Sequence, residues 1–131
     1  MVTAKKRSPP LITSHLLLTP SSANSGTILS IYLFDTFFTG RYFNATADGN
    51  GTIYGLFVGS MIPMPVVIHE AVLGGATSPV FVANPVPLVV DISNTRLIGN
   101  PVMFMPPANV ICTLTSRAGN PIPTVNMGAC P

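Results

Sequence analysis

The chain has 131 residues, enough for one domain of ordinary size and too few for two substantial ones. Only 8% of the residues are charged, where a soluble domain has roughly a quarter, while 47% are apolar and 14 are proline. A surface this neutral gives little colloidal repulsion, so the composition argues against a free cytoplasmic enzyme. It favours a chain that lies against other protein surfaces.

Residues 1–26 are predicted to form an arm and linker. Lys5, Lys6 and Arg7 supply three of the six basic residues, and a possible strand at residues 11–18 follows them. From residue 8 onward, three arginines stand against four acidic residues, so the body offers no basic stripe for nucleic acid. The run at 11–18 is too interrupted for a secretory signal, and no run reaches the roughly 18 apolar residues of a spanning helix.

The body of the chain predicts an all-β fold. Short β-branched and aromatic runs alternate with Gly, Pro, Asn and Asp, which is typical of strands and turns. Residues 48–51 (Asp-Gly-Asn-Gly) predict a tight hairpin, and Gly74-Gly75 predicts a second turn. The expected strands are 27–34, 41–46, 52–58, 66–72, 80–83, 88–92, 102–105, 110–115 and 122–125.

A family resemblance rests on five features in order. They are the pair Phe34-Asp35, the turn Thr39-Gly40, residues 47–51 (Ala-Asp-Gly-Asn-Gly), residues 54–57 (Tyr-Gly-Leu-Phe) and residues 86–92 (Val-Pro-Leu-Val-Val-Asp-Ile). This order resembles the carboxypeptidase regulatory-like, transthyretin-like β-sandwich repeat. Where that family has a Pro-Gly turn and a Tyr-containing strand, this chain has a Met- and Pro-rich segment.

The resemblance implies a single transthyretin-like or Ig-like β-sandwich at residues 27–98. Residues 99–131 are then a strand-rich C-terminal extension that packs on the sandwich or on a neighbour, because prolines restrict its strands to edges. Members of the family are non-catalytic binding or structural modules, and some stand alone in phage virion proteins. No catalytic residue is implied.

The ionisable residues do not predict an enzyme or a cofactor. His69 and Glu70 are neighbours on an expected strand, so their side chains should point to opposite faces and not serve one reacting group. Residues 48–51 lack the further carboxylates of a calcium loop, so a turn explains them. Asn44 and Asn50 begin glycosylation sequons, which matter only in a protein secreted from a eukaryote.

Two cysteines, Cys112 and Cys130, allow either one disulfide that staples the C-terminal tail or two buried thiols. With His15 and His69 they make a formal zinc set. That set lacks the short ligand spacing of structural zinc sites, so no metal site is expected.

The interaction candidates are the basic arm and four methionines beside prolines, since methionine adapts to irregular contacts. Core filling is the alternative role of the methionines. The candidates are Lys5, Lys6, Arg7, Met61, Met64, Met103 and Met105.

These features favour a non-enzymatic structural protein of a large assembly. The leading hypothesis is a phage virion component, either a capsid decoration or minor capsid protein or a tail component, that forms homo-oligomers and binds major capsid or tail subunits. A secreted adhesin or ligand-binding sandwich is one alternative. A metal-holding tip or hub protein of a contractile injection device is another.

Overall fold

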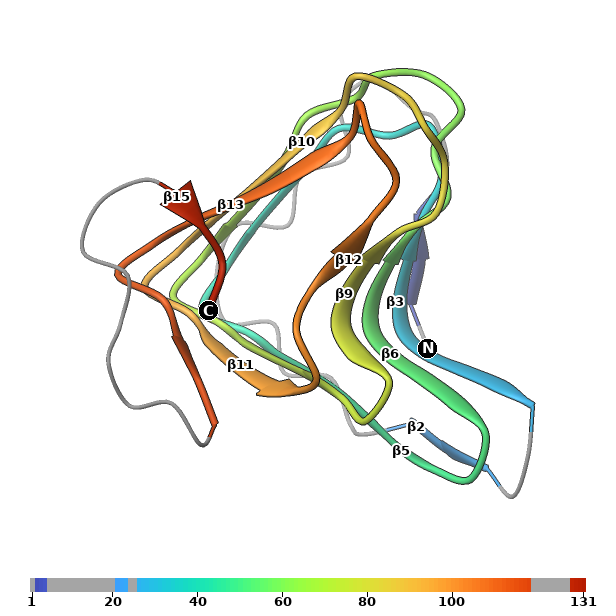
Figure 1. Ribbon diagram of the computed structural model, residues 1–131. Helices are drawn as coiled ribbons and strands as arrows, with labels where there is room; N and C mark the ends of the chain where they lie inside the picture. Colours follow the sequence, from blue (N-terminus) through green and yellow to red (C-terminus); the bar gives the residue numbers. More distant parts are fainter. Residues whose placement is uncertain (1, 5–20, 24–25, 119–127) are drawn as a thin grey trace.

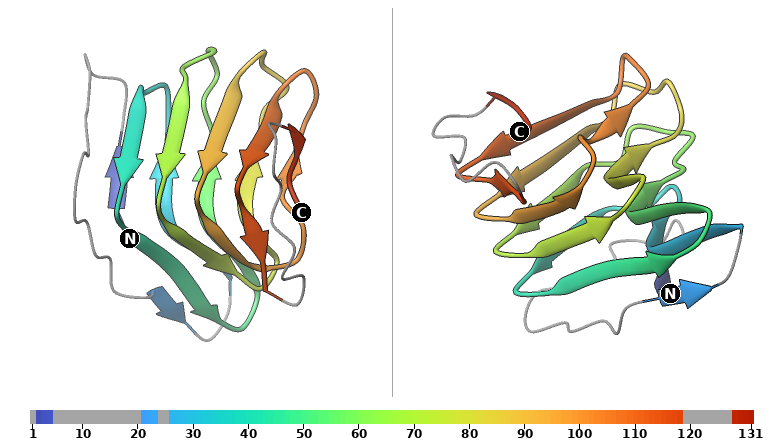
Figure 2. Two further views of the ribbon diagram at one scale, coloured as in Figure 1. Left: turned by 90° about the vertical axis from the view of Figure 1, so that its left-hand side faces the viewer. Right: turned by 60° about the horizontal axis from the view of Figure 1, so that its bottom comes forward.

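The computed structural model describes residues 2–4, 21–23, 26–118 and 128–131. The chain winds as a β-solenoid of about four turns, and each turn, or rung, adds one strand to each of three parallel sheets (Figures 1 and 2). Among the described residues the regular elements are strands and none is a helix. The all-β class is therefore confirmed.

Each sheet is built from strands of successive rungs. Sheet I contains β1 (Val2–Ala4), β3 (Thr27–Leu33), β6 (Thr52–Val58), β9 (Ser78–Val82) and β12 (Met103–Phe104). Sheet II contains β4 (Phe38–Arg41), β7 (Val66–His69), β10 (Val89–Ser93), β13 (Asn109–Thr113) and β15 (Gly128–Ala129). Sheet III contains β2 (Ser21–Ala23), β5 (Asn44–Gly49), β8 (Val72–Gly75), β11 (Arg96–Gly99) and β14 (Ser116–Arg117).

The expected single β-sandwich is wrong. A transthyretin-like sandwich pairs antiparallel strands, whereas here β3 pairs with β6 in parallel, one full rung later. Residues 48–51 do make a turn, but the turn joins β5 in sheet III to β6 in sheet I, so no hairpin forms. A parallel pair needs a long connection, and the other two strands of the rung supply it.

The core fills the space between the three sheets. Ile31, Leu56 and Val80 occupy one register row of sheet I and are fully buried. Because both neighbours in a row come from adjacent rungs, each buried side chain is covered by the rungs above and below it. The same pattern in sheets II and III explains the uninterrupted burial along the solenoid axis.

The corner between sheets II and III has two residues, the first of them in the left-handed conformation, and it is repeated in each of the four rungs. Tyr42, Glu70, Asn94 and Leu114 have φ angles of 55°, 52°, 48° and 49°. The amides of the first three donate to the carbonyl that precedes the corner one rung later, at N···O distances of 3.2, 3.0 and 3.0 Å. This corner splits the expected strands 41–46 and 66–72, each of which is two strands in two sheets.

Sheets III and I meet at a thin edge where backbones touch. A Cβ on Gly55 would lie 2.8 Å from the backbone nitrogen of Gly74, and one on Gly75 would lie 2.7 Å from that of Gly55. Only glycine fits such an approach. The turn expected at Gly74-Gly75 is wrong, because both residues belong to β8.

The corner between sheets I and II is a loop of variable length, formed by residues 34–37, 59–65, 83–88 and 105–108. Side chains join successive loops. The Asp35 carboxylate Oδ1 accepts the amides of Met61 and Ile62 at 2.6 and 3.1 Å, and Asn84 Nδ2 donates to the Gly59 carbonyl at 2.8 Å.

The fourth rung comes from β12, β13 and β14, within the segment expected as an extension at residues 99–131. On the opposite side, β1 and β2 add to sheets I and III within residues 1–26. Strands lie where the sequence predicts them at 27–34, 52–58 and 88–92. The expected strands at 11–18 and 122–125 lie outside the described residues.

Candidate functional site

The C-terminal end of sheet I exposes a residue that belongs to the core. Leu33, Val58 and Val82 form one inward register row and are all 0% exposed, but the next member, Phe104, is 38% exposed. No strand of the described residues pairs with the outer side of β12. Met103 and Met105 beside it are 41% and 46% exposed, and we call these three residues with the outer side of β12 the open edge.

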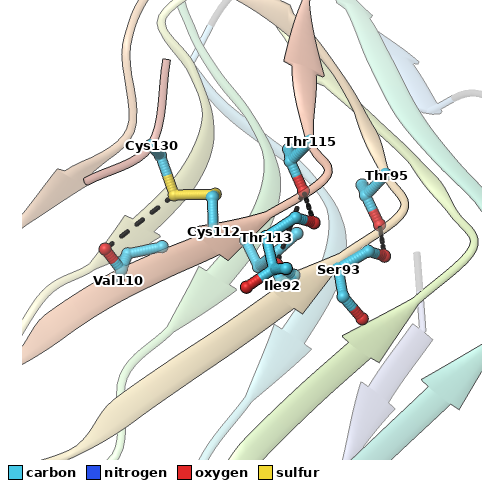
Figure 3. Close-up of a disulfide and its surroundings, with 8 residues drawn as sticks. All are labelled: Ile92, Ser93, Thr95, Val110, Cys112, Thr113, Thr115 and Cys130. Atoms are coloured by element: carbon cyan, nitrogen blue, oxygen red, sulfur yellow. Dashed lines mark hydrogen bonds between the residues drawn. A yellow bond between two sulfur atoms is a disulfide. The ribbon is translucent and has the colours of Figure 1, made fainter. Parts of the chain in front are cut away.

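The end of sheet II is covered by β15. This strand runs antiparallel to β13, and a disulfide between Cys112 and Cys130 joins the two segments with a Cα–Cα distance of 4.9 Å (Figure 3). Cys112 is fully buried, and Sγ of Cys130 lies 3.8 Å from the Val110 carbonyl oxygen. Of the two roles left open for the cysteines, the structure has the disulfide staple.

The end of sheet III is blunted by a charge. Its inward row runs through Ala45, Leu73 and Leu97, each fully buried, and ends at Arg117. The Arg117 guanidinium Nη1 donates to the Gly99 carbonyl at 3.3 Å. An inward-pointing charge at the end of an apolar row discourages a further strand from stacking there. At this end of the described chain, sheet II is closed by a strand and sheet III by a charge, whereas sheet I ends in the open edge.

In the last two corners between sheets II and III, the residue after the left-handed one is a buried threonine and not an apolar residue. Thr95 Oγ1 donates to the Ser93 carbonyl at 2.8 Å, and Thr115 Oγ1 donates to the Thr113 carbonyl at 3.0 Å (Figure 3). Thr95 is 3% exposed and Thr115 is fully buried. Each hydroxyl adds a second donor to a carbonyl that already accepts a backbone amide from the preceding rung, at the point where the strand turns into sheet III.

A polar cluster lies on the outside of the same corner. The Glu70 carboxylate Oε1 accepts a hydrogen bond from Arg41 Nη2 at 3.0 Å, and His69 Nε2 lies 3.0 Å from the same oxygen. The hydrogen bond to Glu70 raises the pKa of Arg41, whose guanidinium also lies 4.6 Å from the Tyr42 ring centroid. The expectation that His69 and Glu70 point to opposite faces is wrong, because the left-handed corner at Glu70 returns its side chain toward His69.

The cluster continues to Ser93, whose Oγ hydrogen-bonds His69 Nδ1 at 2.5 Å. A Ser-His-Glu chain is the arrangement of acyl-transfer enzymes, but those also need free amide donors for the oxyanion. Here the amide after the serine, on Asn94, already donates to the Thr113 carbonyl. The cluster can order a proton between Ser93 and His69, and its described geometry supplies no oxyanion donor at that amide.

The structure separates the predicted methionines into two groups. Met61 is 60% exposed and Met64 is half-buried in the loop at 59–65, while Met103 and Met105 lie two rungs later at the open edge. Phe104 was missed, although it stands between two predicted contact residues. Lys5, Lys6 and Arg7 lie outside the described residues.

The formal zinc set loses two of its four ligands, because both cysteine sulfurs are in the disulfide. In the described part of the chain, no three His, Cys, Asp or Glu side chains gather at metal-binding distance. A search for membrane spans in the same residues finds no helix of the length and apolarity required.

The described residues thus form a short β-solenoid whose C-terminal end leaves the outer side of β12 unpaired among them. No family model, curated protein or solved structure matches the chain. The transthyretin-like resemblance stays a prediction from the sequence, and the sandwich that it implied is replaced by the solenoid.

Proposed function

We propose that this chain is a non-enzymatic structural subunit whose copies bind one another through the open edge. The observation that carries the proposal is the exposure of Phe104 in a row in which Leu33, Val58 and Val82 are fully buried. A residue at a core position is exposed here because nothing described continues its row. Exposed apolar residues around an unpaired strand favour strand addition by a partner.

The closed ends of sheets II and III favour a pair of copies over a filament. Head-to-tail stacking would have to continue all three sheets, and β15 and Arg117 stand in the way of two of them. A two-fold arrangement needs only one self-complementary edge and closes on itself. Two antiparallel β12 strands would bring Met103, Phe104 and Met105 of both copies together.

The disulfide supports a setting outside a reducing cytosol, since such bonds persist in secreted proteins, in the periplasm and on virion or cell surfaces. A virion component that also contacts capsid or tail subunits is one form of the proposal. The composition agrees with it, because few charges have to be desolvated when such a surface is covered.

A secreted ligand-binding protein or adhesin is the second candidate, and the disulfide favours it equally. The two candidates differ in the state of the isolated chain. A ligand-binding solenoid has no need to pair through β12, so it would be a monomer with its open edge free.

The test is the molar mass in solution by light scattering and sedimentation, from low to high micromolar protein. We expect the wild-type chain to be a dimer. Phe104→Lys and Met105→Lys should both give monomers with unchanged circular dichroism, while Met61→Lys, at a more exposed methionine two rungs away, should remain dimeric. A wild-type monomer at high concentration would overturn pairing through the open edge, and a dimer unaffected by Met105→Lys would place the interface elsewhere.

A further inference from the structure

The turn between β5 and β6 presents an asparagine of unusual accessibility. Residues 48–52 are all exposed, and Asn50 lies between Gly49 and Gly51, whose φ angles are 127° and 111°. The two glycines let the chain reverse direction and leave the Asn50 side chain on the outside. Thr52, two residues later, is exposed as well, so both side chains of an Asn-x-Thr sequon can be reached.

The chain carries a second sequon with a contrasting position. Asn44 is the first residue of β5 and is half-buried, and its side-chain oxygen Oδ1 is inaccessible to solvent. The hydroxyl-bearing Thr46 lies in the same strand, with Cγ2 only 2.9 Å from the position of a Cβ on Gly74. A bulky group on Asn44 would therefore meet the rung, whereas one on Asn50 would extend into solvent.

The disulfide provides an independent reason to take the sequon seriously. Cys112–Cys130 requires an oxidising compartment, and in eukaryotes that compartment is also where oligosaccharides are attached to asparagine. The sequence alone did not indicate that the chain enters a compartment in which sequons are glycosylated. The bonded cysteines fit that setting, as they also fit the periplasm and a virion surface.

We propose that Asn50 is an N-glycosylation site and that Asn44 is not. In the reaction the Asn50 amide Nδ2 forms a bond to C1 of the first sugar of a lipid-diphosphate-linked oligosaccharide. The bond between C1 and the phosphate oxygen breaks, the lipid diphosphate leaves with its electron pair, and Nδ2 gives up one proton. The Thr52 hydroxyl is the sequon group that the transferase recognises.

The inference uses the oxidising compartment of the proposed function but not the pairing of copies. Asn50 precedes the second rung and β12 belongs to the fourth, so a glycan on the turn leaves the open edge free. A glycan is read by mass, and pairing is read by the molar mass of the unglycosylated chain. Either result can therefore fail while the other holds.

The experiment is translation of the full chain, behind a cleavable secretion leader, with endoplasmic-reticulum microsomes. Products are treated with peptide N-glycosidase in heavy-oxygen water, which marks each former glycan site as a labelled Asp, and are mapped by peptide mass spectrometry. Thr52→Ser keeps the sequon and Thr52→Ala removes it, so these two variants form a matched pair. Asn44→Gln is the control for the other sequon.

We expect one glycan on the wild type, on Thr52→Ser and on Asn44→Gln, and none on Asn50→Gln or Thr52→Ala. A wild-type chain translocated into the microsomes with no label at residue 50 would overturn the proposal. Label at residue 44 would overturn its second half. The contrast between the two sequons rests on the folded chain, and because Asn50 and Thr52 are both exposed there, their substitutions leave the core unchanged.

Discussion

Two corners of the same solenoid are built in opposite ways. Between sheets II and III, every rung turns through two residues, the first of them left-handed. Between sheets I and II, the loop changes from rung to rung and has four, seven, six and four residues at 34–37, 59–65, 83–88 and 105–108. The comparison indicates that the short corner fixes the shape of the rung, while the long one absorbs changes in chain length.

Insertion at each corner should give the largest contrast. One glycine between Asn94 and Thr95 reverses the inward-outward alternation of β11, since the period of a strand is two residues. Leu97 would leave the core, and loss of a buried leucine side chain alone costs about 2–5 kcal/mol. We expect chemical denaturation to show a destabilisation of at least that size, or loss of the cooperative transition.

The matched insertion is Gly-Ser between Pro63 and Met64, in the loop at 59–65. Lengthening a surface loop costs only a few tenths of a kcal/mol in closure entropy, so unfolding should shift by less than about 1 kcal/mol. Equal losses from the two insertions would contradict the division of roles between the corners.

Thr115→Val should have the next largest effect. The change keeps the shape of a fully buried side chain but removes the hydroxyl that donates to the Thr113 carbonyl at 3.0 Å. The Thr113 carbonyl keeps the Asn94 amide as a donor, so the substitution removes one hydrogen bond, worth about 0.5–1.5 kcal/mol. Urea denaturation should show a loss in that range, while Thr39→Val, on the exposed face of β4, should leave stability unchanged.

Leu114→Asn should instead stabilise the chain. Leu114 holds φ at 49° and is 48% exposed, so the substitution removes little apolar burial. Left-handed backbone costs an ordinary residue about 1–2 kcal/mol, and asparagine tolerates it better. A gain of roughly 1 kcal/mol is expected by thermal or urea unfolding. Asn94→Leu, at the same corner one rung earlier, should lose a similar amount, and a gain there would argue against the corner strain.

Individual strands could be predicted from the sequence, whereas their stacking could not. The alternation in 27–34 and 52–58 is local, and both segments are strands. The repeat that stacks them has no constant length, because the spacing falls from 28 to 24 to 20 residues along sheet II. Of the four corner residues only Asn94 is a usual left-handed residue, so Tyr42, Glu70 and Leu114 gave no sign of a turn.

The candidate site could be predicted in part, for the same reason. Met103 and Met105 could be predicted as contact residues because they are methionines close to prolines. Phe104 becomes informative only through its register with Val82, which depends on strand pairing. The cysteine pair was recognisable as a possible staple, but cysteine spacing alone could not choose a disulfide over two thiols.

Glu70→Gln should have the smallest effect, because the cluster on this corner is solvent-exposed and exposed ion pairs contribute little. We expect a fall in Tm smaller than that of Thr115→Val. The fall in Tm should be smaller in 1 M salt, where the Debye length is about 3 Å. The control is Asp91→Asn in β10, which should not show the same salt dependence.

The sign of the pH dependence follows from Arg41. Hydrogen bonding to Glu70 raises the pKa of Arg41 above its ordinary value, so the charged form is the one that the folded state favours. The contribution of Arg41 is fully present below the pKa of the unfolded chain and is lost only as pH rises through the raised value. Between pH 7 and pH 9 the Arg41→Gln variant should therefore keep a constant difference in Tm from the wild type. If the difference in Tm between Arg41→Gln and the wild type grows or vanishes across this range, another titratable group of the corner, and not the Arg41 guanidinium, controls the stability of the ion pair with Glu70.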